Sequence, residues 1–122
     1  MAKVEVRPAE AGDLGAFAAA TKYRTIKAVV GLVDGEPQAI AGVAFHPGGT
    51  IYAFSELHPP MAPYKMAIAR MAQRMVKIMG ETGCPVVAVE DETIADAGKF
   101  LKWCGFQHQA SCSHGKVYLW KP

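Results

Sequence analysis

Hydrophobic segments separated by turn residues predict strands through the first half of the chain: the first alternates valines with polar residues, and the second is β-branched. The predicted strands are Lys3–Arg7, Ile26–Val33, Pro37–Phe45 and Thr50–Leu57. The second and third are separated by Asp34-Gly35, a pair that two-residue β-hairpin turns prefer. The third and fourth are separated by His46-Pro47-Gly48-Gly49, which predicts another tight turn. These segments therefore predict consecutive antiparallel hairpins.

A helical pattern interrupts the strands after Pro8. Asp13 is expected to cap a helix because its side chain can accept a hydrogen bond from a backbone N–H of the first turn. Leu14, Phe17 and Ala18 follow at helical spacing, and the alanine run that ends at Ala20 favours a helix. We expect this helix to fade near Tyr23.

The apolar period changes again after His58-Pro59-Pro60. Apolar side chains then recur at steps of three and four residues, which predicts an amphipathic helix. They are Met66, Ile68, Met71, Ala72, Met75, Val76 and Met79. Pro63 suits the first turn of this helix, and Gly80 with Gly83 suits its end. We interpret the methionines as core residues, because this flexible side chain fills irregular gaps.

The last third of the chain predicts one more strand, a second helix and a closing hairpin. The predicted strand Pro85–Glu90 begins with Pro85–Val89, a continuous apolar run of the kind found in buried strands. An amphipathic helix with Ile94, Ala97, Leu101 and Cys104 on one face is expected to end at Gly105. The segments Phe106–Ala110 and Lys116–Trp120 are then expected to pair.

This order predicts an α/β (α+β) fold with a twisted, mixed, mostly antiparallel sheet of six or seven strands. Thr50–Leu57, the methionine-rich helix and Pro85–Glu90 are expected to form a right-handed crossover, with the two strands parallel and adjacent. Helices should cover both faces of that sheet.

The composition is typical of a compact globular protein. The chain has 122 residues, of which 51% are hydrophobic and 20% charged, so we expect a single domain over residues 1–122. The net charge of +2 is too small to favour nucleic acid or an anionic membrane as a partner. No apolar run approaches the ~20 residues that span a bilayer, and the charged start Met1–Arg7 is unlike a signal peptide. Three cysteines without CxxC spacing predict reduced thiols in the cytoplasm.

Several strings, in order along the chain, resemble the GCN5-related N-acetyltransferase (GNAT) superfamily. Val6-Arg7-Pro8-Ala9 followed by Asp13-Leu14 is similar to its first strand and first helix, and Leu57-His58-Pro59 to the end of its fourth strand. Phe100-Leu101-Lys102-Trp103-Cys104-Gly105-Phe106 is similar to its late helix, which ends in Gly-Phe. The resemblance spans nearly the whole chain. It implies an acyl-CoA-dependent N-acyltransferase that uses acetyl-CoA as co-substrate and needs no metal.

The resemblance also implies a cofactor site. In the family, the central parallel strands splay apart around the pantetheine arm, and a Q/R-x-x-G-x-G/A turn binds the pyrophosphate through backbone N–H groups. Aligned from Leu57-His58-Pro59, Ala62–Ala67 falls on that turn. Only Ala67 matches it, because Pro63 lacks an N–H and Lys65 replaces a glycine with a point charge. The implied cofactor-binding residues are Leu57, His58, Tyr64, Lys65, Met66 and Ala67.

The implied chemistry is direct attack of an amine on the thioester. Glu56, one residue before the end of the fourth strand, is the candidate base that removes the ammonium proton. The backbone N–H near Leu57 would polarise the thioester carbonyl. Leu101 stands where many members carry a tyrosine acid, and Ile94 where an asparagine is common. A slow reaction or none is therefore expected.

Two further polar clusters have a structural alternative. Glu90-Asp91-Glu92 would make an anionic rim for a cationic amine, although carboxylates also favour the start of a helix. The run from His108 through Cys112 to His114 has metal-capable side chains, but its spacing fits no usual zinc site and favours a polar hairpin loop.

Two classes of function fit these patterns. The first is an N-acyltransferase acting on a small-molecule or protein amine, as a monomer or homodimer. The second is a catalytically inactive module on the same fold, either a protein-binding module or a structural or assembly component of a phage. Short versions of the fold occur among tailed-phage proteins, which the compact chain and its terminal Tyr118-Leu119-Trp120 resemble. The corresponding compartment is the cytoplasm, or a virion if a phage encodes the chain.

Overall fold

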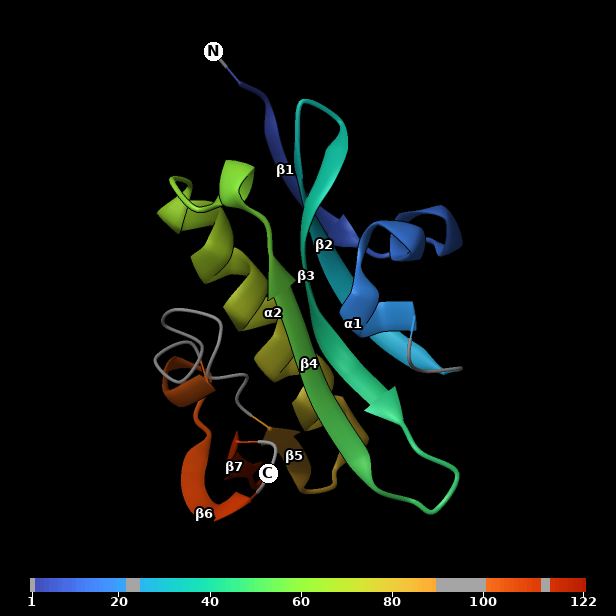
Figure 1. Ribbon diagram of the computed structural model, residues 1–122, viewed down its shortest axis with the longest axis vertical. Coiled ribbons are helices and arrows are strands. Elements are labelled where there is room, and N and C mark those ends of the chain that lie inside the picture. Colours follow the sequence, from blue (N-terminus) through green and yellow to red (C-terminus); the bar gives the residue numbers. More distant parts are fainter. Residues whose placement is uncertain (1, 22–24, 90–100, 113–114) are drawn as a thin grey trace.

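The computed structural model describes residues 2–21, 25–89, 101–112 and 115–122. Within them lies one seven-stranded sheet with the strand order β1-β2-β3-β4-β5-β7-β6 (Figure 1). Its strands are β1 (Val4–Pro8), β2 (Ile26–Val33), β3 (Glu36–Phe45), β4 (Ile51–Leu57), β5 (Val86–Val89), β6 (Gln107–Cys112) and β7 (Gly115–Trp120). Only β4 and β5 run parallel; every other pair is antiparallel. The predicted mixed sheet is confirmed.

The hairpin between β2 and β3 turns at the predicted pair. Asp34 has a φ of 51° and Gly35 a φ of 80°. Two consecutive left-handed residues give the type I′ turn, whose twist matches that of the flanking strands. Aspartate and glycine are residues that tolerate this conformation, so the local sequence is sufficient to specify the turn.

The first helix differs from the prediction. A 3₁₀ helix, η1 (Ala11–Ala16), is followed after Phe17 by a short helix, α1 (Ala18–Thr21). Asp13 lies inside η1, and Glu10 occupies the N-cap position instead. Asp13 stands at the third position of η1, where its carboxylate accepts the Glu10 backbone N–H in a capping box and is also bound by Arg7 of β1. Tyr23, the expected end of the helix, lies outside the described residues.

The methionine-rich helix is confirmed as α2 (Lys65–Thr82). It begins after Pro63, with Tyr64 at the N-cap, so Pro63 precedes the first turn rather than forming part of it. The helix ends at Gly83, whose φ of 65° is the left-handed conformation expected at a helix C-terminus. A second 3₁₀ helix, η2 (Pro59–Met61), links it to β4.

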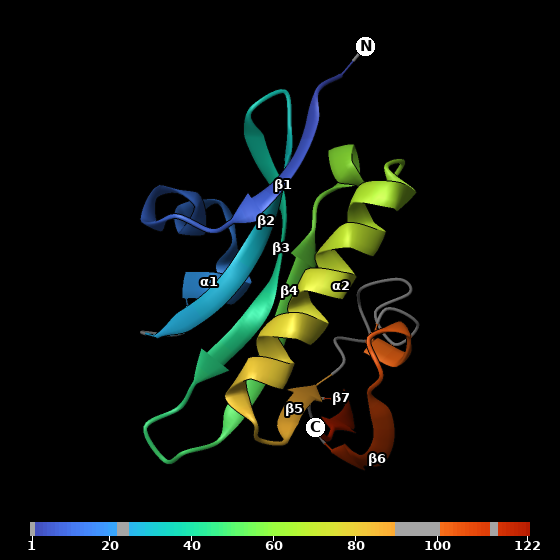
Figure 2. The same ribbon diagram turned by 180° about the vertical axis from the view of Figure 1, so that it is seen from behind.

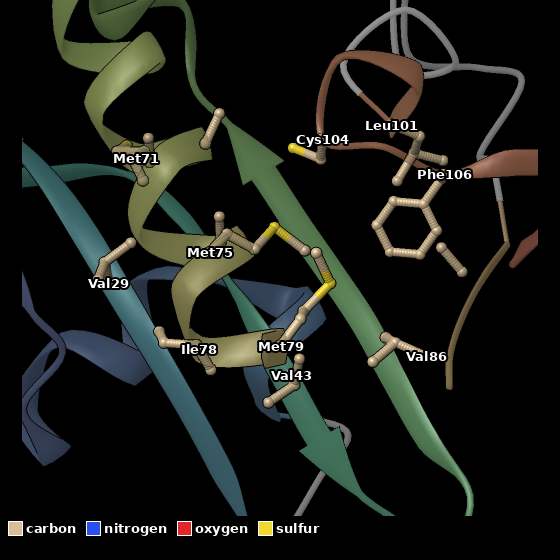
Figure 3. Close-up of a cluster of buried hydrophobic side chains, with 14 of the residues drawn as sticks. Val29, Val43, Met71, Met75, Ile78, Met79, Val86, Leu101, Cys104 and Phe106 are labelled. Atoms are coloured by element: carbon tan, nitrogen blue, oxygen red, sulfur yellow. The ribbon is translucent and has the colours of Figure 1, made fainter. Parts of the chain in front are cut away.

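Most of the methionines lie in the core, as predicted. Met71, Met75 and Met79 pack with residues of the sheet and of the C-terminal segment in one buried cluster (Figure 3). Met66 is the exception, because its residue is 74% exposed in the first turn of α2. It lies outside the cluster.

The C-terminal segment is described in part. Residues 101–103 are helical, and the chain turns at Gly105 with a φ of 96° before the β6–β7 hairpin. Leu101 and Cys104 are buried in the same cluster as the methionines. The rest of the predicted helix, including Ile94 and Ala97, lies outside the described residues.

Helices cover the two faces of the sheet, as predicted. Figure 2 shows α2 lying along one face, and η1 with α1 lies on the other side of the sheet (Figures 1 and 2). Two separate buried clusters correspond to these faces: one contains the α2 methionines and the other contains Phe17 and Phe54. Strand β4 contributes Ile51 to the first cluster and Phe54 to the second.

Candidate active site

Strands β4 and β5 share only a short parallel ladder. The paired residues are Ile51 with Val86 and Tyr52 with Val87. Beyond them β4 continues to Leu57, while β5 ends at Val89 and the two strands separate (Figure 1). Strand β4 therefore has β3 along one edge and, past Tyr52, no strand along the other among the described residues.

The hydrogen-bond phase of the β3–β4 ladder sets what that second edge presents. His46 N donates to the Thr50 carbonyl (3.0 Å), and His58 N donates to the Gln38 carbonyl (2.8 Å). In both pairs the two residues that lie opposite each other are hydrogen-bonded to each other. Such pairs alternate with non-hydrogen-bonded pairs along an antiparallel ladder. The backbone N–H and C=O groups of Ser55 and Leu57 therefore point away from β3, into the place where β4 and β5 have parted.

The Glu56 side chain lies beside this edge, on the α1 face of the sheet. Its Oε1 accepts a hydrogen bond from the Ala19 backbone N–H (3.1 Å), and its Oε2 lies 2.6 Å from Nε2 of His58. The Glu56 and His58 side chains are 21% and 31% exposed, so water reaches both. The Phe17 ring packs against the His58 ring, with 5.0 Å between their centroids.

An ion pair between β1 and η1 holds the segment that leads to Phe17 and Ala19. Arg7 of β1 contacts Asp13 of η1 through two hydrogen bonds, Nη1 to Oδ2 (2.7 Å) and Nη2 to Oδ1 (3.0 Å). Asp13 Oδ2 also accepts the Glu10 backbone N–H (2.7 Å). The hydrogen bond from Arg7 lowers the pKa of Asp13, and the contact raises that of Arg7. The segment that supplies Phe17 and Ala19 is thereby fixed to the sheet.

The N-terminus of α2 has the properties of an anion-binding site. No side chain caps it and its first turn has no acidic residue. Among the described residues, the backbone N–H groups of Met66 and Ala67 have no hydrogen-bond acceptor. Lys65 and Arg70 add positive charge beside a hollow of about 390 Å³ that also has Tyr64 in its lining. Backbone donors at the positive end of a helix favour phosphate oxygens.

The structure separates the predicted site residues into two groups. Glu56, Leu57 and His58 lie together at the end of β4, whereas Tyr64, Lys65, Met66 and Ala67 form the start of α2 after the η2 turn. Leu57 is half exposed, and the His58 imidazole contacts Glu56 and Phe17. Leu101, the position at which the resemblance implies a tyrosine, is buried in the core.

The other candidates contribute less. Glu90-Asp91-Glu92 and His114 lie outside the described residues. Within the described part of the chain, no three His, Cys, Asp or Glu side chains gather as a metal site would require. None of its helices is long and apolar enough to cross a membrane. A larger hollow of about 790 Å³, lined by residues of η1, β2 and the second half of α2, contains none of the predicted site residues.

The pairing of Glu56 with His58 was not foreseen from the sequence. A signal for it exists, since residues two apart on a strand share one face. The contact of Glu56 with Ala19 had no such signal, because these residues are separated by 37 positions and meet only through the packing of α1 on the sheet.

The fold resembles solved structures that are described as acetyltransferases. The yncA protein of Salmonella typhimurium, described as an acetyltransferase and solved with its cofactor acetyl-CoA, superposes with a TM-score of 0.72 at 15% identity over 97% of this chain and 93% of that one. A GCN5-related N-acetyltransferase from Kribbella flavida gives 0.69 at 17% identity over 98% of both chains. The ribosomal-protein-S18-alanine N-acetyltransferase of Escherichia coli gives 0.66 at 11% identity over 96% and 91%. This chain has the GNAT fold.

No protein-family model and no curated protein matches the GNAT-fold chain by sequence. Its likeness to these three solved structures, at 11–17% identity, is one of fold. The resemblance inferred from scattered sequence strings is confirmed at the level of the fold.

Proposed function

We propose that this protein is an acyl-CoA-dependent N-acyltransferase that transfers an acetyl group from acetyl-CoA to an amine. The observation that carries the proposal is the parting of β4 from β5 after two residue pairs, with the backbone groups of Ser55 and Leu57 directed into it. An extended ligand can form strand-like hydrogen bonds with such an edge. A neighbour with the same fold binds acetyl-CoA, which supports this ligand.

The residues present fit acetyl-CoA. Its pantetheine arm carries amide groups that would pair with the Ser55 and Leu57 edge of β4. Its phosphates would lie at the start of α2, near the Met66 and Ala67 N–H groups and the Lys65 ammonium. Lys65 stands where the family pattern has a glycine, so its ammonium charge would contact the phosphate in place of some of the backbone N–H contacts.

The reaction would proceed by direct transfer. The amine nitrogen attacks the thioester carbonyl carbon, the C–N bond forms, and the C–S bond breaks to release the thiolate. The Leu57 N–H stabilises the developing oxyanion, and Glu56 takes the ammonium proton directly or through water. Leu101 has no proton to give, so the thiolate takes its proton from water or another donor. No acyl group is attached to the enzyme at any step.

Binding is tested by thermal shift and calorimetry with acetyl-CoA. A ligand at ~100 times its Kd adds about 2.7 kcal/mol of apparent stability. Lys65→Ala is expected to weaken binding, with a smaller difference from wild type at high salt, because exposed charges are screened. Lys77→Ala is the matched control, since it removes the same charge from an exposed position farther along α2. Equal affinity for all three proteins at low salt would remove Lys65 from the site, and no thermal shift at millimolar acetyl-CoA would exclude the proposed function.

Catalysis is tested by acetyl-CoA consumption across a panel of small amines and peptides with free N-termini or lysines. Glu56→Gln is expected to lower kcat by ~10²–10⁴-fold, the usual contribution of a general base. Glu36→Gln, an exposed glutamate at the β2–β3 turn, should leave the rate unchanged. Turnover by Glu56→Gln equal to that of wild type would exclude Glu56 as the base. An acylated cysteine trapped during turnover would exclude direct transfer.

A further inference from the structure

The Glu56 carboxylate is held at both oxygens. Oε1 accepts the Ala19 backbone N–H at 3.1 Å, and Oε2 lies 2.6 Å from Nε2 of His58. The two side chains come from positions two apart at the end of β4, so they share a face of the sheet. Their exposed fractions of 21% and 31% leave the pair accessible from solvent.

The short contact requires one proton between Oε2 and Nε2. A carboxylate that acts as a base is ionised and only accepts hydrogen bonds, so the proposed function requires the imidazole to donate through Nε2. The Phe17 ring, which is fully buried, lies 5.0 Å from the imidazole and limits the orientations open to it. The ring is thus fixed by an aromatic contact on one side and by the carboxylate on the other.

We propose that His58 is a positioning residue for Glu56: its Nε2–H, together with the Ala19 N–H, orients the carboxylate toward the acceptor amine. The inference rests on the proposed function for its consequence in catalysis. The contacts of the His58 ring are with Glu56 and Phe17, so in this proposal it acts on the reaction through Glu56. This role differs from the cofactor contact that the alignment with the family implies for the same residue.

Two variants separate positioning from other roles. His58→Gln keeps an amide N–H donor at a similar reach, whereas His58→Leu keeps the bulk and removes the donor. We expect His58→Leu to lose ~10²-fold in kcat, the scale on which a misplaced catalytic group costs rate, and His58→Gln to recover most of it. The KM for acetyl-CoA should stay within about twofold of wild type in both, because ground-state binding is unaffected.

A double-mutant cycle tests the dependence on Glu56. If His58 acts only through the carboxylate, Glu56→Gln with His58→Leu should be no slower than Glu56→Gln alone. Multiplicative losses would overturn the proposal and give His58 an independent catalytic role. Failure of His58→Gln to rescue would point to proton transfer through the ring and would also overturn it. A raised KM for acetyl-CoA with unchanged kcat would return His58 to the cofactor site.

A measurement that needs no activity tests the contact itself. Nitrogen-15 NMR of the His58 ring in wild type is expected to find Nε2 protonated, and Glu56→Gln should perturb the Nε2 signal more than the Nδ1 signal. A bare Nε2 with a protonated Nδ1 would mean that Glu56 donates, which would overturn the proposal. If wild type transfers no acetyl group, the proposed function fails, while this spectrum still decides whether His58 holds Glu56.

Discussion

The Arg7–Asp13 ion pair gives a stability prediction that can be worked from the structure. Asp13 is 6% exposed, and its Oδ2 accepts two hydrogen bonds, from Arg7 Nη1 and from the Glu10 backbone N–H. In Asp13→Asn one carboxylate oxygen becomes an NH₂ group. Wherever that group points, it faces an N–H donor of Arg7 or Glu10, and at least one buried hydrogen bond is lost.

The expected cost follows from the chemistry of that bond. Net contributions of hydrogen bonds to charged groups are about 1.5–3 kcal/mol. The Arg7 side chain is 31% exposed, so water replaces part of what it loses, and the lower end of the range applies. We expect Asp13→Asn to lower the free energy of unfolding by about 1.5 kcal/mol and, for a chain of this length, Tm by about 6 °C.

The pH dependence of the free energy of unfolding tests whether the negative charge of Asp13, and not the shape of its side chain, makes this contribution. The pKa of Asp13 is lowered in the folded state, so its contribution is present above the ordinary carboxyl range near ~4 and is lost as pH falls through the lowered value. Urea denaturation from pH 7 to pH 3 should therefore show wild type and Asp13→Asn converging at acid pH. Asp34→Asn, an exposed aspartate whose conformation asparagine tolerates, should stay within 0.5 kcal/mol of wild type at pH 7. A constant difference between wild type and Asp13→Asn at every pH would refute this account of the pair.

Two further predictions concern the core. Met75→Ala should lower the free energy of unfolding by about 2–5 kcal/mol in denaturant titrations, because Met75 is fully buried; Met66→Ala, at 74% exposure, should change it by less than 0.5 kcal/mol. Burial raises the pKa of Cys104 to about 11, so at pH 8 only about one thiol in a thousand is ionised. A thiol reagent followed by peptide mass spectrometry should therefore modify exposed Cys84 and spare Cys104 in the folded protein; equal labelling would contradict the buried position.

The parts of the fold that depend on short-range chemistry were predictable from the sequence. Asp34-Gly35 specifies its own turn, and the methionine spacing specifies a helix whose core face is visible in the pattern. Asp13 shows the limit of this reasoning. Its residue type suits a helix N-cap, but Arg7 on the neighbouring strand binds the carboxylate, and the chain forms a 3₁₀ turn around the ion pair instead. The Arg7 contact is not part of a helix-cap pattern, whereas the capping box of Glu10 and Asp13 is one.

The candidate active site likewise has features that the sequence predicted and features that it did not. The sequence predicted that β4 and β5 pair in parallel, but the length of their shared ladder depends on how both strands pack against α2 and the C-terminal segment. The pairing of Glu56 with His58 was within reach of strand periodicity, whereas the Ala19 N–H was not, because it reaches Glu56 across the packing of two layers.

These contacts connect the stability of the fold to the proposed chemistry. Glu56 belongs to β4, but two of the groups around it, the Ala19 N–H and the Phe17 ring that fixes His58, belong to the segment from η1 to α1. That segment has fewer than two helical turns in α1, too few to be stable alone, so its position depends on the Arg7–Asp13 ion pair and on the burial of Phe17. The orientation of the proposed base therefore depends in part on the contact between β1 and η1. The family motif centred on β4 and α2 indicates where the acyl donor would lie. The orientation of the Glu56 carboxylate depends on contacts that are not part of that motif.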